Sequence, residues 1–224
     1  MRVTLAALAL PALAFAASAH AADKPLTWDD AFSLRDAPKG VHVKASYTDG
    51  KGRSHELEMW RDGDRRLRRR TDDKLELHAE KQGGGEYAFR LIDLAKKRLL
   101  EVNRTNLYRI GVFADWPALA GMITKPKPAH TLRPGARPKE KTPVGECRWV
   151  HLEIKGGGAQ EICWSARFKL PLIIQTVAPA GTFTTVFQVK QVDVKVPGAD
   201  VFKVSSAGLT VIRADEDIDP SSDL

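Results

Sequence analysis

Apolar and polar residues alternate through most of this chain, with the two-residue period of strands that bury one face. The alternation is clear at 41–47, and it repeats at 86–94 and 98–104 on either side of a short turn. It appears again at 147–154 and 160–170, which flank three consecutive glycines. Because short turns separate the paired stretches, the pattern predicts hairpins in an antiparallel meander.

Two short stretches have helical spacing instead. Thr27 can cap one helix, and in the segment 114–123 Asp115 can cap a second helix that has Pro117 in its first turn. Two short helices cannot cover the apolar face of so many strands. We therefore predict a mainly β fold: a curved antiparallel sheet forming an incomplete barrel, with a short N-terminal helix and a helical and loop lid. The alternative is a closed barrel or sandwich filled by its own side chains.

The segment 60–71, WRDGDRRLRRRT, places five arginines in six positions after an Asp-Gly pair. Asp62-Gly63 has the composition of a two-residue hairpin turn. A two-residue turn here pairs Arg61 with Asp64, and continuing this strand register sets Glu56 against Arg69. A bulge is predicted further along, where the alternation changes phase at 190–191. In the hairpin register, one face carries Arg66, Arg68 and Arg70, opposite Met59, Leu57 and His55.

Such a strand sends alternate arginines to opposite faces, so they cannot form one continuous basic stripe. No zinc-ligand set and no aromatic RNA-binding motif accompanies them, and we do not expect a nucleic-acid partner. Arg66, Arg68 and Arg70 are expected either to line the mouth of a cavity, where they would contact anionic head groups, or to be simply exposed.

The first residues have the form of a secretory signal. Arg2 precedes an apolar run at 5–17, and a small-x-small cleavage pattern ends at Ala21. We predict a signal peptide at 1–21, a periplasmic protein, and a single domain at 22–224. Within this domain we expect a mobile, basic, proline-rich loop at 124–145 and a flexible acidic tail at 214–224. The formal net charge of +7 favours anionic lipid or an acidic protein partner over nucleic acid for an exported chain, and the alternative is a solvated basic face with no partner.

The cysteines, histidines, serines and carboxylates show no pattern typical of a catalytic site. Cys147 and Cys163 have equal parity on paired strands, so export predicts a disulfide between them. A redox-active cysteine would call for close spacing and a histidine partner. The histidines form no metal pair, the serines lack a G-x-S-x-G elbow, and the carboxylates show no acid–base pattern. We expect no enzyme, no metal and no cofactor.

The order of elements resembles the periplasmic lipoprotein-carrier superfamily, LolA-like. The resemblance is carried by MWRDGDRRLRRR, LIDLAKKRLLEV, the short helix, CRWVHLEIKGGG, LPLIIQT and the final VPGADVFKVSSAGL. It implies a half-barrel with a helical lid over an apolar cavity, which ferries acylated lipoproteins or senses lipids as the related RseB and MucB regulators do. The carriers' characteristic lid-locking arginine cannot be assigned among so many here. The disulfide hairpin and the basic proline loop depart from the carrier pattern.

These observations predict a non-enzymatic, monomeric periplasmic protein that holds the acyl chains of a lipid or lipidated protein. The alternative is a regulatory or scaffolding module that binds a membrane-protein partner through the same fold. The expected ligand face consists of Tyr87, Phe89, Leu91, Trp164, Phe168, Phe183 and Phe187, with Leu119, Met122 and Ile123 from the lid.

Overall fold

The computed structural model describes residues 26–83, 86–103, 115–137 and 140–213. The predicted signal peptide and acidic tail lie outside these residues. The helices are α1 (Trp28–Phe32), α3 (Trp116–Gly121) and the 3-10 helix η2 (Ala199–Phe202). The strands are β1 (Gly40–Thr48), β2 (Ser54–Asp62), β3 (Arg66–Thr71), β4 (Leu75–Lys81), β5 (Tyr87–Asp93), β6 (Arg98–Asn103), β7 (His130–Pro134), β8 (Glu140–Thr142), β9 (Gly145–Ile154), β10 (Gly158–Ser165), β11 (Leu170–Val177), β12 (Phe183–Asp193) and β13 (Thr210–Arg213).

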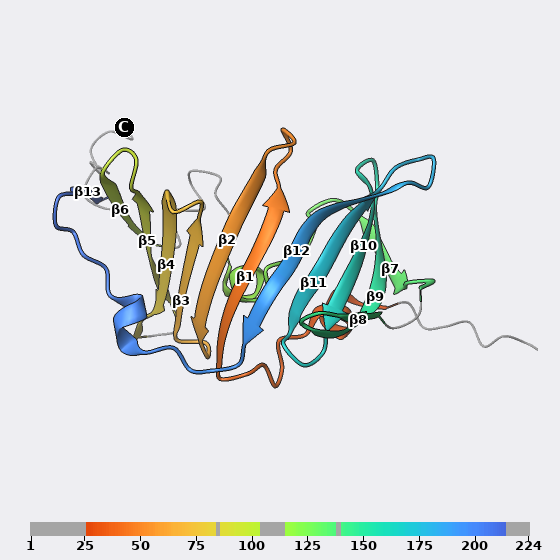
Figure 1. The fold of residues 1–224 in the computed structure, drawn as a ribbon, viewed down its shortest axis with the longest axis horizontal. Helices are drawn as coiled ribbons and strands as arrows, with labels where there is room; N and C mark the ends of the chain where they lie inside the picture. The colour runs from red at the N-terminus through yellow and green to blue at the C-terminus, as the bar shows by residue number, and fades with distance from the viewer. Residues whose placement is uncertain (1–25, 84–85, 104–114, 138–139, 214–224) are drawn as a thin grey trace, which may run out of the picture.

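All strands join one sheet in the order β13-β6-β5-β4-β3-β2-β1-β12-β11-β10-β9-β7, with β8 on β9. The pairings are antiparallel except that between β13 and β6. Among the described strands the two ends, β13 and β7, do not pair, so the sheet is open and curved (Figure 1). The predicted fold class, a curved and incompletely closed antiparallel sheet, is therefore confirmed.

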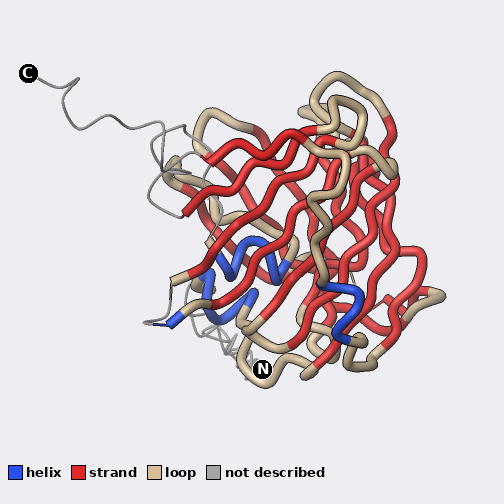
Figure 2. The backbone as a smooth tube through the Cα atoms, turned by 90° about the vertical axis from the view of Figure 1, so that its left-hand side faces the viewer, coloured by secondary structure: helices blue, strands red, loops and turns tan. Residues whose placement is uncertain are grey.

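The two short helices begin where the sequence predicts. Thr27 forms a capping box with Asp30, and Asp115 accepts a hydrogen bond from the Ala118 amide at 2.8 Å. The second helix ends at Met122, whose left-handed backbone (φ 55°) turns the chain away. Both helices lie on one face of the sheet, which we call the lid face; α3 lies behind β1 and β2 in Figure 1, and Figure 2 shows the helices within the curve of the strands.

Two apolar clusters join the helices to the lid face. Around α3, Leu119 and Ala120 pack with Val43 and Met59 from the centre of the sheet. Around α1, Phe32 packs against Trp164 with their rings 5.2 Å apart, on residues from β9 and β10. The helices therefore cover the middle of the sheet and its β9–β10 side, but the β4–β6 side less completely.

The arginine hairpin has a different register from the predicted one. Asp62 pairs with Arg66 and Met59 with Arg69, so Gly63–Arg65 forms a three-residue loop where the sequence predicted a two-residue turn. The buried carboxylate of Asp62 accepts hydrogen bonds from the side chains of both Arg65 and Arg66, which holds the longer loop closed. The predicted pairing of Glu56 with Arg69 is therefore wrong.

Proline-rich residues between 124 and 145 do not form the expected loop. Their described part contains β7 and β8, which both pair with β9. Leu132 of β7 is buried in the cluster around α1, and this burial fixes the strand at the edge of the sheet. Pro134 ends β7, a position that an edge strand tolerates because its outer side needs no backbone donor.

The predicted disulfide is present. Cys147 and Cys163 lie on the face opposite the lid, with their Cα atoms 5.3 Å apart, and both side chains are buried. The predicted bulge near residue 190 is also present, since Gln191 pairs with Lys44 and Val189 with Ala45, leaving Lys190 between them. A second irregularity in β12 separates Thr185 from Phe187.

Candidate ligand-binding face

The lid helices are attached to the sheet by arginines that bind their last carbonyl groups. The last carbonyls of a helix have no partner inside the helix. Arg61 of β2 donates from Nη1 to the Ala120 carbonyl of α3 at 2.6 Å. Arg148 of β9 donates to the Asp30 and Ala31 carbonyls of α1 at 3.1 and 3.3 Å. Each helix is thus fastened at its C-terminal end.

Arg61 is the more unusual of these two residues because it is only 1% exposed. Its Nε and Nη2 are buried and have no hydrogen-bond partner among the described residues. Burial disfavours the charged form and lowers the pKa of Arg61 to about 10. Arg61 still carries its charge at neutral pH, and the carbonyl of Ala120 is the acceptor that balances part of that charge.

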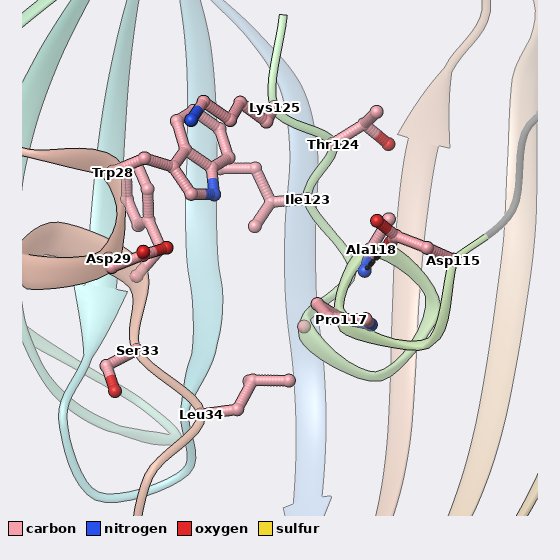
Figure 3. A pocket seen from close by; sticks show the side chains of 12 residues that line it. Trp28, Asp29, Ser33, Leu34, Asp115, Pro117, Ala118, Ile123, Thr124 and Lys125 are labelled. Atoms are coloured by element: carbon pink, nitrogen blue, oxygen red, sulfur yellow. Dashed lines mark hydrogen bonds between the residues drawn. The ribbon is translucent and has the colours of Figure 1, made fainter. Parts of the chain in front are cut away.

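A small pocket lies between the two helices (Figure 3), with a volume of about 360 Å³. Trp28, Phe32 and Leu34 border it on the α1 side, and Pro117 and Ile123 on the α3 side. Asp29, Asp115 and Lys125 bring charge to its lining. The pocket is thus apolar within and polar at its edge, and its volume lies at the lower end of small-ligand sites.

A second hollow, which we call the groove, crosses β3–β6 and β13 on the lid face and has a volume of about 430 Å³. Arg69, Leu77, Leu91 and Leu100 stand in register on four consecutive strands, and Ile212 continues the row on β13. Leu75, 52% exposed, lines the same hollow.

Five charged residues belong to this lining: the acids Glu76 and Asp93, and the cations Arg69, Lys96 and Arg98. Arg69 is half-buried, and desolvation lowers its pKa. Lys96 and Arg98 contribute positive charge where β5 turns into β6, although Lys96 pairs with Asp93 at 3.2 Å. Asp93 is paired with Lys96, and Glu76 with Arg68 on the outer face, so the groove combines an apolar floor with an edge on which positive charge is in excess.

Nine of the ten predicted ligand residues divide into a buried and a half-buried group. Phe89, Trp164, Phe168, Phe187 and Leu119 are buried in the core. Tyr87, Leu91, Met122 and Ile123 are half-buried; Leu91 lines the groove, Ile123 lines the pocket, and the Tyr87 ring stacks on Trp116 at 4.8 Å. The structure thus brings together most of the predicted face, but much of it fills the core.

Phe183 lies on the other face, contrary to the prediction that it shares a side with Phe187. Phe187 pairs with Ile174, whereas Thr185 pairs with Gln175, so the irregularity between them reverses the alternation. Phe183 is 49% exposed, and its ring lies 4.7 Å from the Arg137 guanidinium.

Arg66, Arg68 and Arg70 also lie on the face opposite the lid, away from the groove. They pair with Asp62, Trp60 and Glu58 instead of the residues predicted from the shorter turn. Arg68 binds the Glu76 carboxylate at 2.6 Å, and the guanidinium groups of Arg68 and Arg70 lie 5.1 and 5.5 Å from the Trp60 ring.

Their charges are balanced by neighbouring carboxylates. Arg66 binds Asp62 at 2.8 Å, and Arg70 binds Asp73 at 2.8 Å. Burial raises the pKa of Glu76, but hydrogen bonds from His78 and Arg68 outweigh it and lower the pKa to about 2. These arginines therefore form an ion-pair and aromatic network on the outer face, away from the groove, and their contact with anionic head groups stays a prediction.

The sequence interpretation missed Arg61, Arg69, Leu77, Leu100 and Ile212. Arg69 was hidden because the two-residue turn set it against Glu56, whereas it pairs with Met59. Arg61 was missed because no local pattern shows that the end of α3 lies over it. Leu77 and Leu100 do alternate with polar neighbours, and that signal alone could have placed them on the face of Leu91.

Two further observations concern the described residues only. No group of three or more His, Cys, Asp or Glu side chains there is placed to hold a metal ion. None of the helices there has both the length and the apolar character needed to cross a bilayer.

The fold and its attached helices define a lidded, open antiparallel half-barrel. No protein-family model and no curated protein matches the chain. Similar solved structures are a crystal structure of MucB (15% identity, 80% of this chain, 62% of that chain, TM-score 0.45) and the complex of Pseudomonas aeruginosa MucA/MucB (18%, 77%, 58%, 0.42). A third is MucB in complex with MucA(peri) (17%, 77%, 56%, 0.42). This chain thus spans less than two thirds of each solved chain, and these likenesses assign it no ligand.

Proposed function

We propose that this protein is an exported, non-enzymatic binding module that holds an extended segment of a membrane-protein partner in the groove. The observation that carries this proposal is the row of Leu77, Leu91, Leu100 and Ile212, which forms an apolar floor across four strands. A partner segment would place apolar side chains on this floor and acidic side chains near Lys96 and Arg98.

The shape of the groove favours a peptide over an acyl chain. An acyl chain gains most when it is enclosed on all sides, since every exposed methylene keeps its contact with water. The middle of the lid face offers no such enclosure, because Phe89, Trp164 and Phe187 fill it. The groove is open to one side, as the 52% exposure of Leu75 indicates. An amphipathic segment suits such a groove, because its apolar side chains can pack on the floor while its polar side chains stay in solvent.

A second candidate function is the binding of an acyl chain from a lipid or lipoprotein. The pocket between α1 and α3 favours it, since Trp28, Phe32, Leu34 and Ile123 give this pocket an apolar lining beneath the lid. Release of Ala120 from Arg61 would let α3 move and enlarge the pocket. Lipid extraction followed by mass spectrometry of the purified protein tests this candidate directly.

The test of the main proposal is photo-crosslinking in the native host. Leu75 lines the groove at 52% exposure, and it is replaced by the photo-reactive residue p-benzoylphenylalanine. Val194 is the matched control, since it is 51% exposed and lies beside His42 and Trp60 on the other face. We expect a covalent adduct with a membrane protein from position 75 and not from position 194.

Two results would contradict the main proposal. One is the absence of any protein adduct from position 75 while acyl lipid co-purifies in stoichiometric amount, which would favour the second candidate. The other is an equal yield of the same adducts from positions 75 and 194, which would indicate non-specific contact.

A further inference from the structure

Residues 214–224, ADEDIDPSSDL, follow directly after β13 and lie outside the described residues. They contain five acidic residues, with an apolar Ile218 near the middle and Leu224 after the last acid. The segment therefore has the composition of an acidic chain with two apolar anchors. Its attachment point is Arg213, the neighbour of Ile212 in the groove lining.

Cations border the groove in excess of the two acids, Glu76 and Asp93, that also line it. Lys74 lies in the turn between β3 and β4, and Lys97 and Arg98 lie at the start of β6. The two turns are adjacent, since the Leu94 amide donates to the Lys74 carbonyl at 2.8 Å. None of these three cations forms an ion pair within 4.0 Å of a carboxylate among the described residues, although the charge of Lys74 acts on Asp72. Unpaired cations at a groove edge attract an acidic segment at short range.

The length of the segment is sufficient to reach the whole groove. Neighbouring strands lie about 4.8 Å apart, so the four steps from β13 to β3 cover about 19 Å. The eleven residues 214–224 span at most about 36 Å when extended. The segment can therefore turn back from Arg213 and cross the groove while its acids lie near the cationic rim.

We infer that residues 214–224 occupy the groove of their own chain and compete there with the partner segment. The inference rests on the proposed function for its purpose, since it names an internal competitor for the same site. Ile218 and Leu224 pack on the leucine floor, and the acids lie near Arg98 and its neighbours. Because the segment is tethered, its local concentration is high, and a partner must displace it to bind.

The test uses the purified full chain with p-benzoylphenylalanine at position 75, without any partner. After illumination at low salt, tryptic peptides are mapped by mass spectrometry. We expect an intramolecular crosslink between position 75 and residues 214–224, with a yield independent of protein concentration. The yield should fall several-fold in 1 M salt, where the screening length is only about 3 Å.

Charge variants show whether the rim attracts the segment. Lys74→Gln combined with Arg98→Gln should lower the crosslink yield several-fold. Arg133→Gln is the matched control, because Arg133 is an exposed arginine at the far end of the sheet, on β7, and should leave the yield unchanged. Replacing the five acids of 214–224 by their amides should have the same effect as the double rim variant.

The inference is overturned if no crosslink to 214–224 forms at low salt, or if position 194 gives the same yield as position 75. An unchanged yield in the double rim variant would also overturn it. Failure of the proposed function looks different. In that case the intramolecular crosslink forms in the purified chain, but no partner adduct appears in the native host.

Discussion

Replacement of Arg61 by methionine tests what this buried arginine does for the fold. The lowered pKa, about 10 against an ordinary 12.5, corresponds to about 3 kcal/mol of unfavourable free energy for keeping the charge inside the protein. Methionine has similar length and no charge, so it removes this cost. It also removes the 2.6 Å hydrogen bond to Ala120, and a bond from a charged donor contributes about 1.5–3 kcal/mol.

These two effects nearly cancel. We therefore expect Arg61→Met to change the free energy of unfolding, measured by urea denaturation, by less than about 1.5 kcal/mol. Arg61→Ala leaves a cavity in addition and should destabilise the protein by about 2 kcal/mol or more. Arg61→Met should destabilise α3 more than it destabilises the whole protein, because the Ala120 carbonyl at the end of α3 loses its partner.

Hydrogen exchange of residues 115–123 measures that local effect. The amides of Leu119 and Met122 are bonded within or at the end of α3, and they should exchange faster in Arg61→Met than in the native protein. A loss of more than about 3 kcal/mol in Arg61→Met would refute the cancellation. Unchanged exchange in α3 would refute the idea that Arg61 fastens the lid.

Three other predictions concern covalent and ionisable groups. Alkylation without reductant should label neither cysteine in protein exported by its native host, and Cys147→Ala with Cys163→Ala should lower stability by about 3 kcal/mol; two labelled cysteines would exclude the bond. His55 donates hydrogen bonds to the carboxylates of Asp72 and Asp49, and these bonds raise its pKa, so its stabilising contribution is complete below pH 6.5 and is lost as the pH rises through the raised value. The melting temperature of His55→Gln should therefore vary less over this pH range than that of the native protein. The lowered pKa of Glu76 stabilises the fold above about pH 4.5, and the stabilisation is lost as the pH falls toward about 2. Glu76→Gln should reduce this loss of stability at acid pH, measured as the melting temperature against pH. An unchanged loss would show that other groups cause it.

A further prediction separates the roles of Arg66, Arg68 and Arg70 in stability and in binding. Because the network on the face opposite the lid balances the charges of Arg66, Arg68 and Arg70, replacing all three by glutamine should lower thermal stability and leave groove crosslinking from Leu75 unchanged. A loss of crosslinking with no loss of stability would return these residues to a ligand-binding role.

Local sequence signals were sufficient to predict the β class, the two helix starts, the disulfide and the bulge near residue 190. All of these follow from local rules: alternation between neighbours, a capping side chain within three residues, and equal parity of Cys147 and Cys163 on a hairpin. Such signals need no knowledge of which distant strands meet. They also predicted that Phe89, Leu91 and Trp164 share the apolar side of the sheet.

Tertiary structure decided where the arginines lie and which apolar surface is open. The three-residue loop after Asp62 is held by its buried carboxylate, and it shifts every pairing along β3, which a turn rule cannot foresee. Likewise, a one-residue irregularity in β12 sends Phe183 to the opposite face. Ile212 reaches the groove only because β13 joins β6 from more than a hundred residues away, and the sequence pattern carries no signal for that contact.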